Sequence, residues 1–222
     1  WATSMVACGD ADGAVTGNTR RYGASLEKIQ KVIDPRPGEI MFGLNMIVNK
    51  GKTVFVGDTS VHEYPSSEQL AEIAISSARV VKLFGFDPKV AFVSHSTFGQ
   101  PLTSRTKHIK NAVDILKGKD VNFKFDGDMQ PDVALNDQYK ELYPFSEIVG
   151  NANILIMPGQ HSAAISYKMM RELGGAKVIG PLLIGLAQPI EIAPLRSSTS
   201  DILNLASVAA YSAGIIDYNQ KD

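Results

Sequence analysis

Short continuous apolar segments alternate with longer segments of helical periodicity along most of this chain. Residues 66–83 place Leu70 and Ile73 on one helical face, and residues 89–94 then form an apolar segment typical of a buried strand. Strands that alternate with full-length helices predict an α/β fold in which a mainly parallel sheet is covered by helices. In such sheets, ligands bind beyond the carboxyl ends of the strands. Residues 95–99, which follow the strand at 89–94, are therefore an expected ligand-binding loop.

Local sequence signals set the expected boundaries of the elements. Asn49 and Gly51 indicate a hairpin turn, Ser66 or Ser67 starts a helix, and Gly85 ends it. Helices are expected at residues 25–33, 66–84, 103–117, 162–173 and 199–213, and through Leu135. Strands are expected at residues 40–48, 53–56, 89–94, 121–125, 153–157, 182–186 and 190–193, and an acidic loop is expected at residues 126–132.

Charge and composition exclude several classes of protein. The 22 Lys and Arg residues balance 23 Asp and Glu residues, so the chain lacks the field that binds a nucleic acid or an anionic membrane. The apolar run at residues 179–187 is interrupted by Pro181 and is too short to span a membrane. The single cysteine, Cys8, allows no internal disulfide and suits a reducing compartment, so a cytoplasmic location is expected. The chain opens without an initiator Met, on residues that resemble the end of a helix, and we expect a fragment.

The residues alone indicate a ligand-binding platform and no particular reaction. Neither a glycine-rich phosphate loop nor a nucleophile elbow is present in the sequence. His161 follows a predicted strand and begins a helix, where an imidazole could meet a phosphate, although a capping or solvated histidine is the commoner use.

Metal binding is not expected from the spacing of the possible ligands. His62, His95 and His108 have no partner at metal-ligand spacing. The carboxylates of the acidic loop could converge on a divalent cation, or they could accept backbone N–H groups in a turn before the next helix; we favour the turn. These carboxylates belong to Asp126, Asp128 and Asp132.

A series of motifs in chain order resembles phosphate acetyltransferases. These motifs lie at residues 9–17, 35–38, 55–59, 66–74, 89–99, 126–130, 132–135 and 180–189. Each is weak alone, but together they span nearly the whole chain, and they make it similar to the phosphate acetyl/butyryltransferase family. Further motifs at residues 18–22, 32–38 and 201–207 are most similar to the domain fused to the C-terminal side of bacterial NADP-dependent malic enzymes.

The resemblance implies a fold, an activity and a set of partners. It implies a phosphotransacetylase-like domain over residues 1–222, with two α/β/α lobes related to isocitrate and isopropylmalate dehydrogenases, a cleft between them and the N-terminal part of the first lobe missing. Such domains form homodimers or larger homo-oligomers and pass an acetyl group between acetyl phosphate and coenzyme A. In the fused form, NADP and a divalent metal belong to the malic enzyme part, so we expect neither a cofactor nor a metal in this domain.

The family's reactive residues are only partly matched. The family holds its reactants with adjacent serine and arginine residues before the last helix, and an aspartate nearby takes the thiol proton. Asp201 matches the aspartate, but Pro194 and Leu195 fall where the serine and arginine belong. A slip of one residue could bring Arg196 or Ser197 to that place. The segment 158–161 also departs from the family's pattern, so we expect little or no transferase activity.

The candidate site residues are carried over from the resemblance. Asp201 would be catalytic if activity survives, and Asp128 is a weaker candidate contact. The candidate ligand contacts are Thr16, Gly17, Arg20, Arg21, Ser96, Thr97, Asn153, Gly180, Pro181 and Arg196. Several of these residue types also serve turns, helix caps and strand ends.

Three functions remain open from the sequence. The first is a regulatory domain that binds acetyl-CoA or a related CoA thioester and changes the activity of the fused malic enzyme. The second is an active phosphate acetyltransferase that uses Asp201 as the base and Arg196 or Arg20 for phosphate. The third is an oligomerisation module that uses the apolar final helix, whose candidate contacts are Leu203, Ala206, Val208, Ala209 and Tyr211. These residues could also belong to the core, and we favour the core because it is the commoner place for them.

Overall fold

The computed structural model describes residues 1–219, which divide into two compact units. Residues 44–178 form one unit, and residues 1–43 together with the described residues from 179 onward form the other. The presence of two units agrees with the two-lobed architecture expected from the sequence. Strands β2 (Phe42–Asn49) and β7 (Lys177–Ile184) both extend across the boundary between the units.

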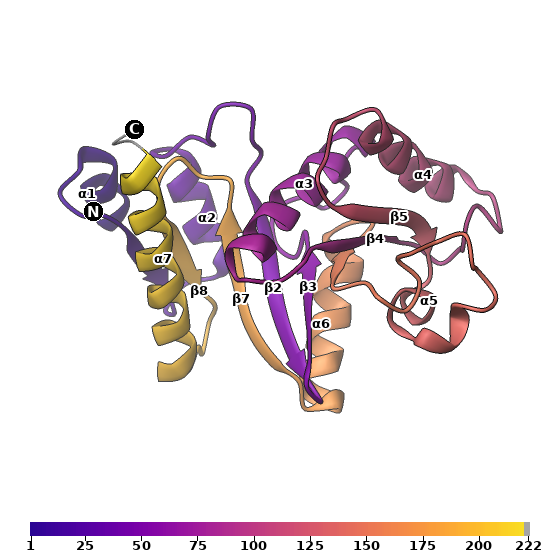
Figure 1. Cartoon of the computed structure of the whole chain (residues 1–222). Helices are drawn as coiled ribbons and strands as arrows, with labels where there is room; N and C mark the ends of the chain where they lie inside the picture. The colour runs from indigo at the N-terminus through magenta and orange to yellow at the C-terminus, as the bar shows by residue number, and fades with distance from the viewer. Residues whose placement is uncertain (220–222) are drawn as a thin grey trace. The chain divides into compact units, whose positions relative to one another are not determined.

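The unit formed by residues 44–178 is built on a mixed sheet. Its strands, in spatial order, are β5 (Lys124–Met129), β4 (Lys89–Val93), β6 (Ile154–Ile156), β3 (Lys52–Gly57) and β2. Strands β5, β4, β6 and β3 run parallel to one another, and β2 pairs antiparallel with β3 (Figure 1). The predicted parallel core is therefore confirmed, with an antiparallel strand added to it.

The hairpin between β2 and β3 turns at the predicted position. Lys50 and Gly51 occupy the turn with φ angles of 48° and 78°. Positive φ at both central residues is the geometry of a type I′ turn, whose twist matches that of the flanking strands. The register that follows pairs Asn49 with Lys52 and Leu44 with Gly57.

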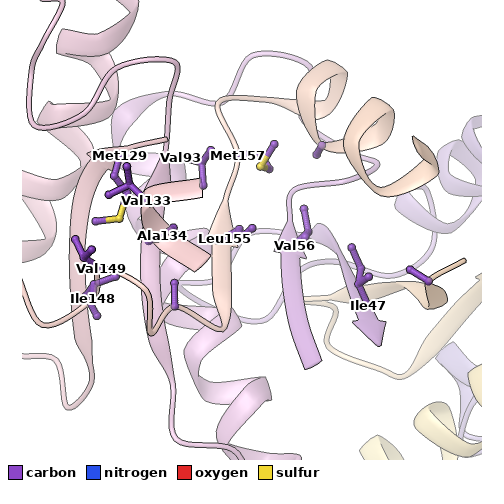
Figure 2. Close-up of a cluster of buried hydrophobic side chains, with 14 residues drawn as sticks. Ile47, Val56, Val93, Met129, Val133, Ala134, Ile148, Val149, Leu155 and Met157 are labelled. Carbon is purple, nitrogen blue, oxygen red and sulfur yellow. The ribbon is translucent and has the colours of Figure 1, made fainter. Parts of the chain in front are cut away.

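Helices cover both faces of this sheet. Helices α3 (Ser67–Leu83) and α4 (Ser104–Lys117) lie on one face, and α5 (Pro131–Leu135) and α6 (Gln160–Gly174) lie on the other (Figure 1). The core beneath α5 and α6 joins strand residues to Val133, Ala134 and Ala163 of these helices (Figure 2). Its strand residues include Val56, Ala91, Val93, Met129 and Leu155.

Capping boxes fix the starts of the two helices on the first face. The Ser66 hydroxyl accepts from the N–H of Gln69, whose side chain accepts from the N–H of Ser66. Thr103 and Thr106 make the same reciprocal pair before α4. Both starts agree with the sequence prediction because the capping residues stand directly before the apolar periodicity.

The other unit pairs two strands that are far apart in the sequence. Strand β1 (Ala14–Gly17) lies parallel to β8 (Ile190–Ala193), with Ala14 opposite Ile190 and Gly17 opposite Ala193. Its helices are α1 (Ala2–Cys8), α2 (Tyr22–Gln30) and α7 (Thr199–Asn219). Leu205 and Ala209 of α7 are buried.

The final helix does not bury all of its expected core positions. Leu203 and Tyr211 are 65% and 50% exposed. Assignment of these two residues to the core is therefore wrong, whereas Ala209 is buried as expected. Among residues 1–219, no helix combines the length and the apolar character needed to cross a membrane.

Strand β5 corrects the expected acidic loop. Asp126 and Asp128 lie inside β5, and the strand extends to Met129. Asp-Gly sequences usually indicate turns, but here Gly127 has a φ of 150° and passes so close to Phe92 that an added Cβ would lie 2.8 Å from the Phe92 side chain. Pairing with β4 therefore overrides the local turn signal.

Candidate functional site

A candidate site lies at the carboxyl edge of the parallel strands, wholly within residues 44–178. Here the chain leaves β4 and β6 and enters helices α4 and α6, and the residues before α3 complete the wall. The cavity has a volume of about 730 Å³, within the range of small-molecule sites. We call it the strand-end pocket. Its lining is Glu63, Tyr64, Pro65, Ser66, Gln69, Val93, Ser94, His95, Ser104, Arg105, His108, Ile109, Pro131, Met157, Pro158, Gly159, His161 and Ser162.

The loop at residues 58–66 is fixed by a buried carboxylate. Asp58 accepts hydrogen bonds from the N–H groups of Ser60, Val61 and His62 at 2.9, 3.1 and 2.7 Å. Its Oδ2 also lies 2.7 Å from Nδ1 of the His62 ring. Because Asp58 is 0% exposed, these contacts hold the loop from within the protein. They place Glu63, Tyr64 and Pro65 at the pocket wall.

His161 forms part of the opposite wall at the start of α6. Its Nε2 lies 3.0 Å from Oε1 of Glu63, and its ring stacks against Tyr64 with 6.2 Å between the ring centroids. The side chain is 68% exposed, as expected for a solvated histidine, but it also lines a cavity and has a carboxylate partner. His161 is therefore solvated, the commoner of the two uses that the sequence left open, and contact with a phosphate stays a prediction.

His108 has both ring nitrogens engaged by the protein. Nε2 lies 2.8 Å from the carbonyl oxygen of Pro65, and Nδ1 lies 3.0 Å from the hydroxyl of Ser67. A carbonyl oxygen can only accept, so Nε2 carries a proton. This histidine holds α4 against the loop before α3 and presents no unused nitrogen to a ligand.

Arg105 supplies the permanent positive charge of the strand-end pocket. It lies in the first turn of α4 and is exposed. Among residues 1–219, its side chain has neither a hydrogen bond nor an ion pair. Glu63, which is the one carboxylate of the lining, is paired with His161. The N-terminal ends of α3, α4 and α6 also meet this cavity, so the pocket favours an anionic ligand.

The sequence-predicted residues of this unit lie outside the pocket lining. Ser96 is fully buried and donates its hydroxyl to Asp128, and Thr97 accepts from the N–H of Gln130 at 3.3 Å. Asp128 also accepts from the N–H of Gly99 at 2.9 Å. These contacts bind the loop after β4 to the end of β5. The side chains of Ser96, Thr97 and Asp128 thus have protein partners in place of a ligand.

Asn153 stands at the opposite edge of the sheet. Its amide oxygen accepts from the N–H of Lys89 at 2.8 Å, and its amide nitrogen donates to the carbonyl oxygen of Asp87 at 2.8 Å. Asn153 directly precedes β6, so it lies at the amino end of the parallel strands, away from the strand-end pocket. Its role here is to fix the start of β4.

A second cavity, of about 530 Å³, lies within the other unit. Thr16, Gly17 and Arg20 line it, as does Lys28 of α2. We call it the Arg20 pocket. Arg21 does not line it but is the N-cap residue of α2. Three of the predicted contacts are therefore brought together beside a second cation.

Comparison with known proteins identifies the family. The sequence model described as phosphate acetyl/butaryl transferase matches residues 1–210. The chain belongs to this family. It is 50% identical to an NADP-dependent malic enzyme of Rhizobium meliloti over 96% of this chain and 28% of that protein. It is also 33% identical to the phosphate acetyltransferase of Bacillus subtilis, over 96% of this chain and 67% of that protein.

A solved structure supports the same family fold. A phosphotransacetylase from Streptococcus pyogenes superposes with a TM-score of 0.90 at 30% identity, over 95% of this chain and 65% of that chain. The chain thus spans little more than a quarter of the malic enzyme that it resembles, and about two thirds of the Bacillus subtilis transferase.

Asp201, the residue predicted to match the family's aspartate, caps a helix in this chain. Oδ2 of Asp201 accepts from both the N–H and the hydroxyl of Ser198, each at 2.8 Å. The Ser198 hydroxyl accepts in return from the N–H of Asp201 at 3.2 Å. This reciprocal pair closes the first turn of α7. Asp201 therefore has a structural role whether or not it takes part in a reaction.

The segment before α7 carries no reactive pair in the described structure. Arg196 is exposed and has a φ of 64°, and within residues 1–219 its guanidinium makes neither a hydrogen bond nor an ion pair with Asp201. The Ser197 hydroxyl donates to the carbonyl oxygen of Pro194 at 2.8 Å. Of the two residues that the one-residue slip would supply, Ser197 is thus used in a turn and Arg196 is exposed to solvent.

Gly180 and Pro181 lie inside β7 and not at a strand end. Pro181 is buried, and neither residue lines the strand-end pocket or the Arg20 pocket. The part of the chain that the structure describes contains no group of three or more His, Cys, Asp or Glu side chains arranged to hold a metal ion.

Gly159 provides a first test of the pocket wall. A Cβ added at this position would lie 2.4 Å from the carbonyl oxygen of Glu63, so Gly159→Ala should push the Glu63–Tyr64 segment outward and lower the free energy of unfolding by about 1–3 kcal/mol. Gly174→Ala is the matched control. Its added Cβ would meet Asn49 at 3.7 Å, and alanine favours the helix by about 0.5–1 kcal/mol. Urea denaturation measures the free energy of unfolding of both variants. Equal values would contradict the close approach of Gly159 to the Glu63 carbonyl oxygen.

Proposed function

We propose that this chain is the phosphotransacetylase-like part of an NADP-dependent malic enzyme. In this proposal it binds acetyl-CoA or a related CoA thioester as a regulator and has little or no transferase activity of its own. The observation that carries the proposal is the presence of Pro194 and Leu195 where the resemblance places the reactive pair. Proline and leucine provide neither a forked charge for phosphate oxygens nor a side-chain donor.

The cavities support retained binding. The strand-end pocket combines apolar walls with the charge of Arg105, and the Arg20 pocket places Arg20 beside Lys28. A CoA thioester carries several phosphate charges and an extended organic body, which such surfaces suit. A regulatory ligand requires a binding site but no catalytic residues.

The regulatory role follows from linkage between binding and conformation. A thioester changes the activity of an attached enzyme only if it binds two states of the protein with different affinities. We place NADP and the divalent metal in the malic enzyme part. We also propose a cytoplasmic protein that forms homodimers or larger homo-oligomers, a common route by which a ligand couples subunits.

Calorimetry and a transferase assay test this function together. We expect acetyl-CoA to bind the chain with a dissociation constant below about 1 mM. We expect thiol release from acetyl-CoA plus phosphate to be at least about 100-fold slower than with the Bacillus subtilis enzyme, the loss typical of one missing donor in a reactive site. No heat of binding at millimolar acetyl-CoA would overturn the proposal.

An active phosphate acetyltransferase is the second candidate. Its support is the 33% identity to the Bacillus subtilis transferase and the presence of Asp201. In this case Arg20 or Arg196 would bind phosphate and Asp201 would take the thiol proton. Turnover comparable to that of the Bacillus subtilis enzyme, abolished by Asp201→Asn, would select this candidate over the regulator.

A further inference from the structure

We infer that the strand-end pocket binds the adenosine-phosphate end of the CoA thioester through Tyr64, His161 and Arg105. The inference rests on the proposed function and assigns one end of the ligand to one cavity. Three properties of the pocket carry it: an exposed aromatic surface on a fixed loop, an unpaired cation, and a lining in which several hydroxyl and imidazole groups are already engaged by the protein.

The aromatic surface is suited to a purine ring. Tyr64 is 77% exposed although it stands on the loop that Asp58 holds from within. Its ring lies at 24° to the ring of His161, so the two present a nearly parallel pair of faces at the cavity. Pro65 and Pro158 add rigid apolar surface beside them. Bases stack well on such surfaces because each base has an extended π face.

The charge of the pocket is suited to a phosphate ester. Arg105 has no side-chain partner among residues 1–219 and stands at the N-terminal end of α4. A guanidinium binds phosphate oxygens through two parallel N–H groups. His95, which is exposed in the same lining, can add a further donor. The Glu63 carboxylate is engaged by the His161 ring at 3.0 Å and makes no ion pair with Arg105 among residues 1–219.

The lining is poorly suited to the reacting acyl end. The Ser162 hydroxyl donates to the carbonyl oxygen of Gly159 at 2.8 Å, and the Ser66 hydroxyl accepts from Gln69. Ser94 pairs with Ser96, and His108 has both nitrogens engaged. Hydroxyl and imidazole groups that the protein already engages are not free to act as nucleophile and base on a thioester. The nucleotide end, which undergoes no chemistry, fits these groups better.

The test uses calorimetry on the whole chain with three probes: acetyl-CoA, adenosine 3′,5′-bisphosphate and inorganic phosphate. Arg105→Gln should weaken binding of acetyl-CoA and of the bisphosphate by about 10- to 100-fold, as expected for loss of a charged hydrogen bond. Tyr64→Ser should weaken both by about tenfold, and Tyr64→Phe should restore binding because it keeps the ring. Lys107→Gln, on an exposed position of α4 outside the lining, is the matched control and should change neither.

The outcomes separate the two proposals. If acetyl-CoA binds but Arg105→Gln and Tyr64→Ser have no effect, the inference is wrong and the proposed function stands. If the bisphosphate does not bind, or if inorganic phosphate competes with acetyl-CoA as well as the bisphosphate does, the pocket is not a nucleotide site. If acetyl-CoA fails to bind while the bisphosphate binds through Arg105 and Tyr64, the proposed function falls and the nucleotide site remains.

Discussion

Replacing Glu191 by glutamine should make the protein more stable at alkaline pH than the native chain. Glu191 is 3% exposed in β8, and its Oε2 accepts from the N–H of Leu183 at 2.9 Å. Burial raises the pKa of the Glu191 carboxyl from its ordinary value of 4.5 to about 8, against a smaller lowering by the hydrogen bond to Leu183. At neutral pH the folded protein therefore holds a neutral Glu191.

The pKa of Glu191 gives the stability change a definite direction. The unfolded chain loses this proton near pH 4.5, whereas the folded chain keeps it to about pH 8. Between these values the folded state binds the extra proton, so the free energy of unfolding falls by about 1.4 kcal/mol for each unit of rising pH. Above pH 8 the contribution of Glu191 to the free energy of unfolding no longer changes with pH. Glutamine can still accept from Leu183 but does not titrate. Glu191→Gln should therefore remove this fall of the free energy of unfolding with rising pH.

Urea denaturation between pH 5 and 9 measures the effect of Glu191. Other titrating groups contribute equally to the native chain and the variant, so the difference between the two curves isolates residue 191. Glu172→Gln, at a side chain that is 67% exposed, is the control and should leave the curve unchanged. Parallel curves for the native chain and Glu191→Gln would show that the buried carboxyl ionises at an ordinary pKa.

Asp58→Ala should destabilise the protein by about 3 kcal/mol and abolish binding at the strand-end pocket. The substitution removes a fully buried acceptor and leaves the N–H groups of Ser60, Val61 and His62 without this partner. Hydrogen bonds to a charged group contribute about 1.5–3 kcal/mol each, and part of the loss is recovered if water enters the released loop. Tyr64 would then lose its fixed position.

Thermal and urea unfolding measure the Asp58 substitution, with acetyl-CoA calorimetry as the second readout. Asp114→Ala is the matched control because that carboxylate is 53% exposed and makes a surface ion pair with Lys117. Such pairs contribute about 0–1 kcal/mol. Asp58→Asn keeps one acceptor oxygen, so its free energy of unfolding should lie between those of Asp58→Ala and Asp114→Ala. If Asp58→Ala were as stable as Asp114→Ala, the loop would not depend on this carboxylate.

Elements with their own start and stop signals could be predicted from the sequence. The capping residue Ser66 and the turn residues Lys50 and Gly51 act through contacts a few positions away, so their effect is visible in the local sequence. Strand β5 could not be predicted in the same way. Its Asp-Gly sequence favours a turn, and only pairing with β4, more than thirty positions away, makes it a strand.

The candidate site shows the same division between local and distant contacts. Ser96, Thr97 and Asn153 are residue types that bind ligands and also satisfy loop backbone, and their partners became visible only in the folded chain. Arg105 and Tyr64 meet in one cavity although each belongs to a different segment. The available signal was positional: Tyr64 lies between the end of a parallel strand and the next helix, and Arg105 lies in the first turn of the helix that follows another such strand.

The pairing of β1 with β8 has a consequence for the order of folding during synthesis. β1 leaves the ribosome long before Ile190 and its neighbours are translated, whereas residues 44–178 emerge as one uninterrupted stretch. That stretch can fold as a unit while β1 still has an unpaired edge. Slow or paused translation after residue 178 would prolong this exposure and favour association between nascent chains through β1.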